Sequence, residues 1–143
     1  MSKVPGRLHA TGGVLFILCG IAHTIGQFSS IPLSEAASSL ERTMKTSIIP
    51  GTPFTYWNVM QCWGALYGAM TILFGVMLLA CLRASGGNPR VRRVTGITGA
   101  IAAAVQSASS WYFNAYPPMF FMIPVGALLL MAAFWAERQP ASA

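Results

Sequence analysis

The longest apolar run of the chain is WNVMQCWGALYGAMTILFGVMLLACL, residues 57–82, which contains no Asp, Glu, Lys or Arg. A helix needs about 20 apolar residues to cross the hydrocarbon core of a bilayer, and this run exceeds that length. The predicted helix should therefore tilt in the bilayer or project from it. Of all residues, 55% are hydrophobic and 8% are charged. Because a soluble domain carries about 25% charged residues, we expect an integral membrane protein.

Three further apolar runs lie at residues 8–28, 94–113 and 118–136. Each reaches or approaches the length of a spanning helix. The run at 94–113 is the least hydrophobic and is rich in Ala, Ser and Gly, small residues that let helices pack closely. The sequence thus predicts an all-α fold, a polytopic membrane four-helix bundle that forms a single domain over residues 1–143.

The connection at residues 29–56 is too long for a plain loop. Ser34 can cap a helix that has Glu35 in its first turn. Apolar residues then recur at helical spacing, and the charged residues Glu41, Arg42 and Lys45 lie elsewhere around the helix. The apolar positions are Ala37, Leu40, Met44 and Ile48. This pattern predicts a short interfacial helix that lies on the outer membrane surface and ends before Pro50.

The basic residues predict the orientation of the bundle. Two of them lie in the 29–56 connection and none in the 114–117 connection. The remaining seven lie before the first apolar run, in the 83–93 connection or after the last run: Lys3, Arg7, Arg83, Arg90, Arg92, Arg93 and Arg138. Since connections rich in Lys and Arg stay inside, both termini are expected in the cytoplasm. The first run is too long for a signal peptide, so we expect it to be retained.

Polar side chains within the apolar runs are the candidates for function, because an ionisable group inside a membrane carries an energetic cost. His23 is the clear case. At 1.5 Å per residue, His23, Gln61 and Gln106 lie about 8, 6 and 10 Å below the outer boundary of their runs. We expect three helices to place these side chains in one polar pocket near the outer leaflet. The alternative is a hydrogen-bonded cluster that only holds the helices together.

His23 is the catalytic candidate, because imidazole both takes up and releases protons near neutral pH. Trp63 and Tyr67 lie one to two turns inside their run and are candidates for the pocket walls. The full set of candidate ligand-binding residues is Gln27, Asn58, Gln61, Trp63, Tyr67, Gln106 and Ser110.

The carboxylate inventory excludes several chemistries. The chain has no Asp, and Glu35, Glu41 and Glu137 all lie outside the apolar runs. Paired-carboxylate catalysis and Mg²⁺-dependent diphosphate chemistry therefore have no residues to use. The basic residues that give the net charge of +6 are scattered between apolar runs. Membrane orientation explains them, and no nucleic-acid partner is expected.

The histidines and cysteines predict neither a cofactor nor a metal. His9 and His23 lie about 21 Å apart along one helix, so they cannot bind one haem together. His9 is expected at the cytoplasmic boundary of the membrane. Cys19, Cys62 and Cys81 are expected to be buried free thiols, and no Cys or His spacing indicates zinc.

Several short motifs resemble a bacterial family of small four-span membrane proteins of unknown function. Residues 20–26, GIAHTIG, resemble the family's G-x-x-H-T-x-G segment. Residues 44–45 and 55–58 are similar to its M-K and S/T-Y-W-D/N elements, and residues 112–113 and 117–118 fit its aromatic and proline pairs. The resemblance covers most of the chain. It implies a four-helix bundle in the bacterial inner (cytoplasmic) membrane, with no known activity. The signature positions it implies are His23, Lys45, Trp57 and Asn58. Where the family often has Asp, this chain has Asn58, and this departure argues against a carboxylate acting there.

Two functions fit these residues. The first is binding of a lipophilic small molecule, such as a lipid, quinone or isoprenoid-like compound, with its polar end at His23, Gln61 and Gln106. His23 could then catalyse an isomerisation, cyclisation or hydration as a general acid or base. The second is a non-catalytic accessory subunit that packs its small-residue stripes against a membrane partner. A transporter is a third choice; it would need a homo-oligomer and lacks the usual membrane carboxylate.

Overall fold

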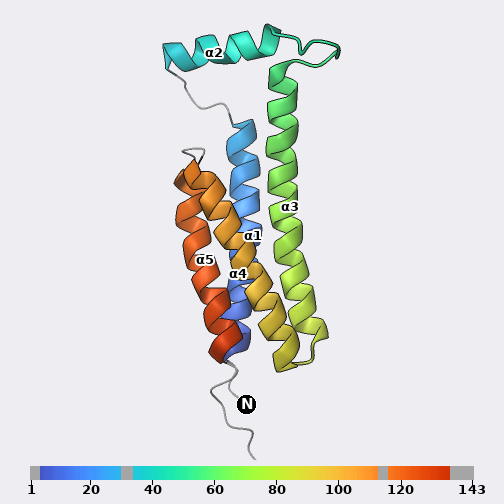
Figure 1. The fold of residues 1–143 in the computed structure, drawn as a ribbon, viewed down its shortest axis with the longest axis vertical. Coiled ribbons are helices and arrows are strands. Elements are labelled where there is room, and N and C mark those ends of the chain that lie inside the picture. The colour runs from blue at the N-terminus through green and yellow to red at the C-terminus, as the bar shows by residue number, and fades with distance from the viewer. Residues whose placement is uncertain (1–3, 30–33, 113–115, 136–143) are drawn as a thin grey trace, which may run out of the picture.

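The computed structural model describes residues 4–29, 34–112 and 116–135. These residues form five helices, which Figure 1 shows in chain order. The helices are α1 (Val4–Phe28), α2 (Glu35–Thr46), α3 (Tyr56–Ala84), α4 (Pro89–Tyr112) and α5 (Tyr116–Trp135). Within the described ranges, β pairing is limited to a single bridge between Ile48 and Thr55. The predicted all-α fold is therefore confirmed.

Three helices are long and apolar enough to cross a membrane: α1, α3 and the Pro118–Trp135 part of α5. Their outward surfaces carry many exposed large apolar side chains, among them Leu18, Met70, Leu73 and Ile123. So much exposed apolar surface is unusual for a soluble monomer and is explained by contact with lipid. Helix α4 has 24 residues, but arginines in its first turns and many small residues make it less apolar than the other three.

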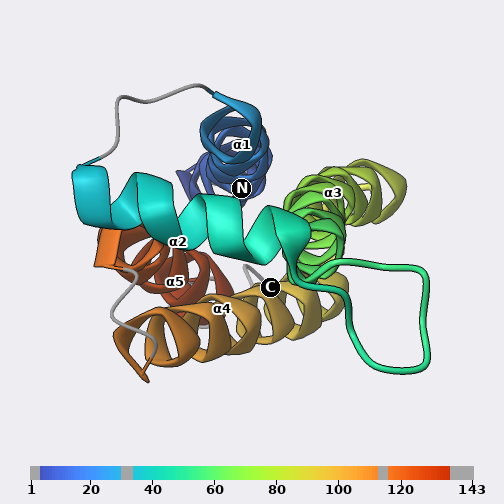
Figure 2. The same ribbon diagram turned by 90° about the horizontal axis from the view of Figure 1, so that it is seen from above.

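The long helices pack side by side, and α2 lies across one end of them (Figures 1 and 2). Helix α1 packs along both α3 and α5, and α4 packs along α5, while α1 and α4 meet at only a few residues. The core between them contains Phe16, Leu78, Met122, Val125 and Leu129, all essentially without exposed surface. Phe16 from α1 and Phe74 from α3 meet edge to face with their ring centroids 5.1 Å apart.

Glycines bring α1 and α3 into close contact. A Cβ added at Gly20 would lie 2.7 Å from the carbonyl oxygen of Gly68, and one at Gly75 would lie 2.6 Å from that of Gly13. Backbone atoms occupy that space, so side chains have no room there. This is the small-residue packing by which membrane helices associate.

Helix α2 begins where the sequence predicts. Ser34 is its N-cap, and the Ser34 hydroxyl accepts a hydrogen bond from the Ala37 N–H at 3.3 Å. Lys45 and Glu41 form an ion pair one turn apart. No residue of α2 is buried, so the helix contributes little to the core.

One sequence expectation about burial is wrong. Of the three cysteines expected to be buried, Cys19 is buried, Cys81 is partly buried and Cys62 is exposed on α3. All three thiols are free. His9, near the start of α1, is completely buried, with its Nε2 atom 3.4 Å from Thr95 Oγ1 of α4, and its expected place at the cytoplasmic boundary stays a prediction. Hydropathy places a residue within a helix, but it does not tell which face a neighbouring helix covers.

Candidate functional site

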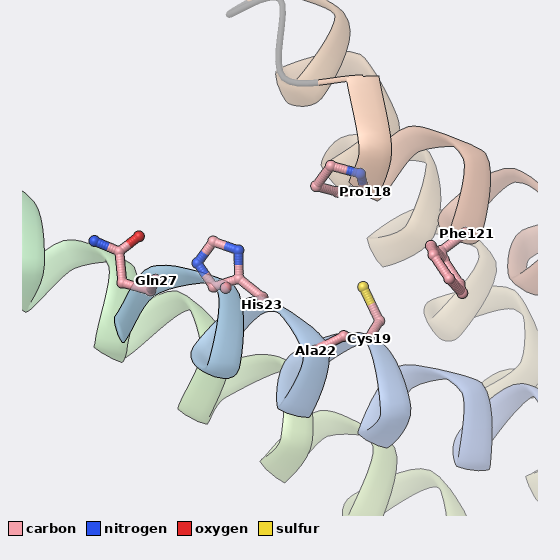
Figure 3. A pocket seen from close by; sticks show the side chains of 7 residues that line it. Cys19, Ala22, His23, Gln27, Pro118 and Phe121 are labelled. Atoms are coloured by element: carbon pink, nitrogen blue, oxygen red, sulfur yellow. The ribbon is translucent and has the colours of Figure 1, made fainter. Parts of the chain in front are cut away.

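A pocket of about 380 Å³ opens between α1 and α5, near the end of the bundle that α2 crosses. Figure 3 shows Cys19, His23 and Gln27 in a row along α1, with Pro118 and Phe121 opposite them on α5. The complete lining is Cys19, Ala22, His23, Gly26, Gln27, Pro118 and Phe121. The polar groups of the lining are the imidazole of His23 and the side-chain amide of Gln27. The rest of the wall is apolar apart from the Cys19 thiol.

The helical repeat of α1 accounts for this row. Positions 19, 23 and 27 are four residues apart, and positions 22 and 26 lie three residues from them, so all five share one face of the helix. The adjacent face carries Gly13 and Gly20, which pack against α3. One helix thus presents a tightly packed face to α3 and a pocket-lining face to the opening beside α5.

His23 is held at the pocket wall by an aromatic contact. Its imidazole meets the Tyr67 ring of α3 edge to face, with centroids 4.7 Å apart and an interplanar angle of 62°. The Nε2 atom is buried and has no hydrogen-bond partner. Buried polar atoms almost always have a partner, so this unpaired ring nitrogen at the pocket wall is a candidate for binding a ligand.

Gln27 is the second polar side chain of the pocket, and α3 fixes its position. Its amide Nε2 donates to Gln61 Oε1 at 3.2 Å. Its side-chain amide also covers Gly64, where an added Cβ would come within 2.5 Å of the Gln27 amide carbon. Gln61 therefore acts through Gln27 and does not itself line the pocket.

Gln106 lies in a separate polar contact between α3 and α4. Its Nε2 donates to Thr71 Oγ1 at 3.3 Å, and the Thr71 hydroxyl donates to the Tyr67 carbonyl at 2.8 Å. The Gln106 Oε1 atom is buried without a partner. The structure thus brings His23, Gln27, Gln61 and Tyr67 together. It does not extend the same pocket to α4, because α4 packs on α5 instead of α1.

Three other predicted ligand-binding residues lie away from the pocket. Asn58 forms a capping box at the start of α3, where its Oδ1 accepts hydrogen bonds from the Thr55 N–H at 3.0 Å and the Thr55 hydroxyl at 2.6 Å. Trp63 is 68% exposed on the outward surface of α3, and Ser110 is buried on α4. None of them lines the opening between α1 and α5.

The pocket also contains residues that sequence reasoning did not select. Pro118 and Phe121 come from the apolar α5, which offers no polar signal, and only the packing of α1 on α5 reveals them. Cys19 could have been found, since it lies one helical turn before His23 on the same face. Among the described residues, no three His, Cys, Asp or Glu side chains come close enough to hold a metal ion.

The signature positions implied by the resemblance divide between two places. His23 lines the pocket, whereas the Lys45 ammonium lies over the Trp57 ring, 4.7 Å from its centroid, beside the Asn58 cap. The contact between Lys45 and Trp57 joins α2 to the start of α3.

No protein-family model, curated protein or solved structure significantly matches this chain. The resemblance therefore stays a prediction.

Proposed function

We propose that the chain crosses the bacterial inner membrane four times, with α4 as the fourth span and both termini in the cytoplasm. Helix α4 supports this because it runs along α5 and exposes Val94, Ile101 and Val105 on its outer side. These side chains would face water if α4 lay outside the bilayer. The amphipathic α2 would lie on the outer surface.

We infer that the pocket between α1 and α5 binds a lipophilic small molecule that has one polar end. The observation that carries this proposal is the buried and unpartnered Nε2 of His23 in a wall that is otherwise nearly apolar. A hydroxyl or carbonyl group of the ligand would hydrogen-bond this nitrogen. Cys19, Ala22 and Phe121 would contact the apolar body.

The size and position of the pocket support the same ligand class. Small-molecule sites occupy about 300–1,000 Å³, and a pocket of about 380 Å³ can hold a ring or a headgroup. Its opening lies between two helices that would both cross the bilayer, so a longer tail would extend sideways into lipid. Lipids, quinones and isoprenoid-like compounds share this combination of a compact polar end and a long apolar tail.

If the ligand is also a substrate, His23 is the group that would move protons. A neutral imidazole can donate from one nitrogen and accept at the other, which suits an isomerisation, cyclisation or hydration. Tyr67 would fix the plane of the ring, and Gln27, held by Gln61, would orient the polar end. The thiol of Cys19 lies one turn away and would contact the same molecule.

Native mass spectrometry of the purified full chain tests this proposal through the ligand that co-purifies. Phe121→Ala should lose that ligand, whereas Phe120→Ala should retain it. The two variants remove the same side chain from neighbouring positions, and only Phe121 lines the pocket. Equal retention in both variants would contradict binding at this pocket.

A specific observation favours the accessory-subunit alternative. A second groove of about 410 Å³ lies between α4 and α5, lined mainly by small and apolar side chains. Its lining is Ala100, Ala104, Ser107, Met122, Ile123, Gly126, Ala127 and Leu130. A partner helix could pack closely there. Ala104→Leu would fill the groove, so this alternative predicts a smaller complex in native gels of solubilised membranes, with the pocket ligand retained.

A further inference from the structure

A second buried polar cluster lies at the opposite end of the bundle from α2. It consists of His9 on α1 and Arg92 and Thr95 on α4. His9 has no exposed surface, and Arg92 is only 7% exposed. His9 Nε2 lies 3.4 Å from Thr95 Oγ1. Neither the pocket at His23 nor the proposed function uses these residues.

The hydrogen bonds of this cluster leave two buried atoms without partners. The Thr95 hydroxyl donates its one proton to the Val91 carbonyl at 2.8 Å, so its oxygen can only accept from His9 Nε2–H. His9 Nδ1 and Arg92 Nε are then both buried without a hydrogen-bond partner. An unsatisfied donor on a charged group is among the most unfavourable atoms to bury.

The described charged side chains at the end of the bundle that contains Arg92 are all positive. Among the described residues, the arginines at this end are Arg7, Arg83, Arg90, Arg92 and Arg93. The described carboxylates, Glu35 and Glu41, are both on α2 at the other end (Figure 1). A guanidinium that is largely buried without a compensating anion is costly. The described part of the protein supplies no such anion, so an anion from elsewhere would lower this cost.

We propose that Arg92 binds the phosphate of an anionic phospholipid in the cytoplasmic leaflet. The ends of α1, α3, α4 and α5 that meet here would lie at headgroup depth in the proposed membrane orientation. Guanidinium is suited to phosphate because its planar donors match two phosphate oxygens. Basic sites between membrane helices on this side commonly bind anionic headgroups. The inference rests on the proposed membrane location and is independent of ligand binding at His23.

Lipid binding to the full chain in detergent tests the assignment. Native mass spectrometry and thermal unfolding would compare phosphatidylglycerol, phosphatidylcholine and inorganic phosphate. We expect phosphatidylglycerol to bind at least about tenfold more tightly than phosphatidylcholine and to raise the unfolding temperature, since hydrogen bonds to a charged group are the strong ones. Arg92→Gln should abolish the preference, and Arg90→Gln should keep it. The control removes the same charge from an exposed position two residues away.

Other outcomes would overturn the proposal. An equal loss of preference in both variants would mean that surface charge alone attracts the lipid. A temperature rise reproduced by inorganic phosphate would assign the site to free phosphate. A preference that is absent in the native chain and present in Glu137→Gln would show that this carboxylate already neutralises Arg92. If Arg92→Gln does not fold, Arg92→Lys and Arg90→Lys provide the comparison, and only Arg92→Lys should weaken phosphatidylglycerol binding, because an ammonium lacks the planar donor pair.

Discussion

The imidazole of His23 packs edge to face against the ring of Tyr67, which joins α1 to α3 at the wall of the pocket. The contact restricts the imidazole without using its Nε2 atom for hydrogen bonding. A residue that only held the helices together would have its polar atoms paired across the interface. Hydrogen bonds between helices join Gln27 to Gln61 and Gln106 to Thr71, whereas His23 Nε2 makes none.

Replacing His23 by Ala should therefore affect ligand binding more than stability. The variant loses an aromatic contact worth about 0.5–1.5 kcal/mol and breaks no hydrogen bond of Nε2. We expect a small decrease in unfolding temperature in detergent. Ligand retention should fall at least about tenfold, because the ligand's polar end would lose one hydrogen bond in a site without water. A large loss of stability with ligand retention unchanged would favour the accessory-subunit alternative.

The two glutamine pairs allow a sharper comparison. Gln61→Leu removes the acceptor that holds Gln27 at the pocket, so ligand retention should fall. Gln106→Leu breaks its bond to Thr71, worth about 0.6 kcal/mol in a membrane protein, but also removes the unsatisfied Oε1 atom. Its unfolding temperature should therefore stay the same or rise, with ligand retention preserved. Loss of ligand in Gln106→Leu would mean that the site extends to α4.

Much of the fold could be predicted because hydropathy and caps are local properties. The interfacial helix was expected after Ser34, and α2 begins at Glu35. Helix α4 begins at Pro89, five positions before the predicted apolar run, because its first turns carry arginines that hydropathy excludes from a span. Which helices are neighbours depends on packing between distant segments. The sequence therefore did not predict that α5 would complete the pocket.

The same distinction explains the candidate site. His23, Gln27, Gln61 and Tyr67 could be predicted because polar residues of apolar helices turn toward one another and away from lipid. The sequence could not distinguish Asn58 as a cap from Asn58 as a ligand-binding residue, since both uses place an Asn in the first turn. Likewise the position of His9 near the start of the helix did not show that Thr95 of α4 lies against it. Depth along a helix is readable from sequence, but the covered face is not.

The close contact between α1 and α3 should tolerate no added side chain. In Gly20→Ala the new Cβ would meet the Gly68 carbonyl oxygen at 2.7 Å and the Ile72 backbone nitrogen at 2.9 Å, and neither can move without shifting α3. Overpacking of this kind costs about 1–3 kcal/mol, so the unfolding temperature should fall clearly. Gly6→Ala is the matched control on the same helix, because nothing lies within 4 Å of its added Cβ. Equal stability of the two variants would mean that α1 and α3 are not in backbone contact.

The proposed four-span topology predicts which positions an impermeant thiol reagent can reach from outside intact cells. Single cysteines would be introduced into a chain whose native cysteines are replaced by Ala. Ser38→Cys on α2 and Asn114→Cys, after α4 in the sequence, should be labelled, whereas Ser85→Cys between α3 and α4 should react only after the membrane is permeabilised. The reason is the distribution of arginines, which predicts that the 83–93 connection lies inside. Labelling at Ser38→Cys, with Asn114→Cys and Ser85→Cys both protected, would show that α4 does not cross the membrane. Labelling at Ser85→Cys alone would invert the orientation and move the phosphate site at Arg92 to the outer leaflet.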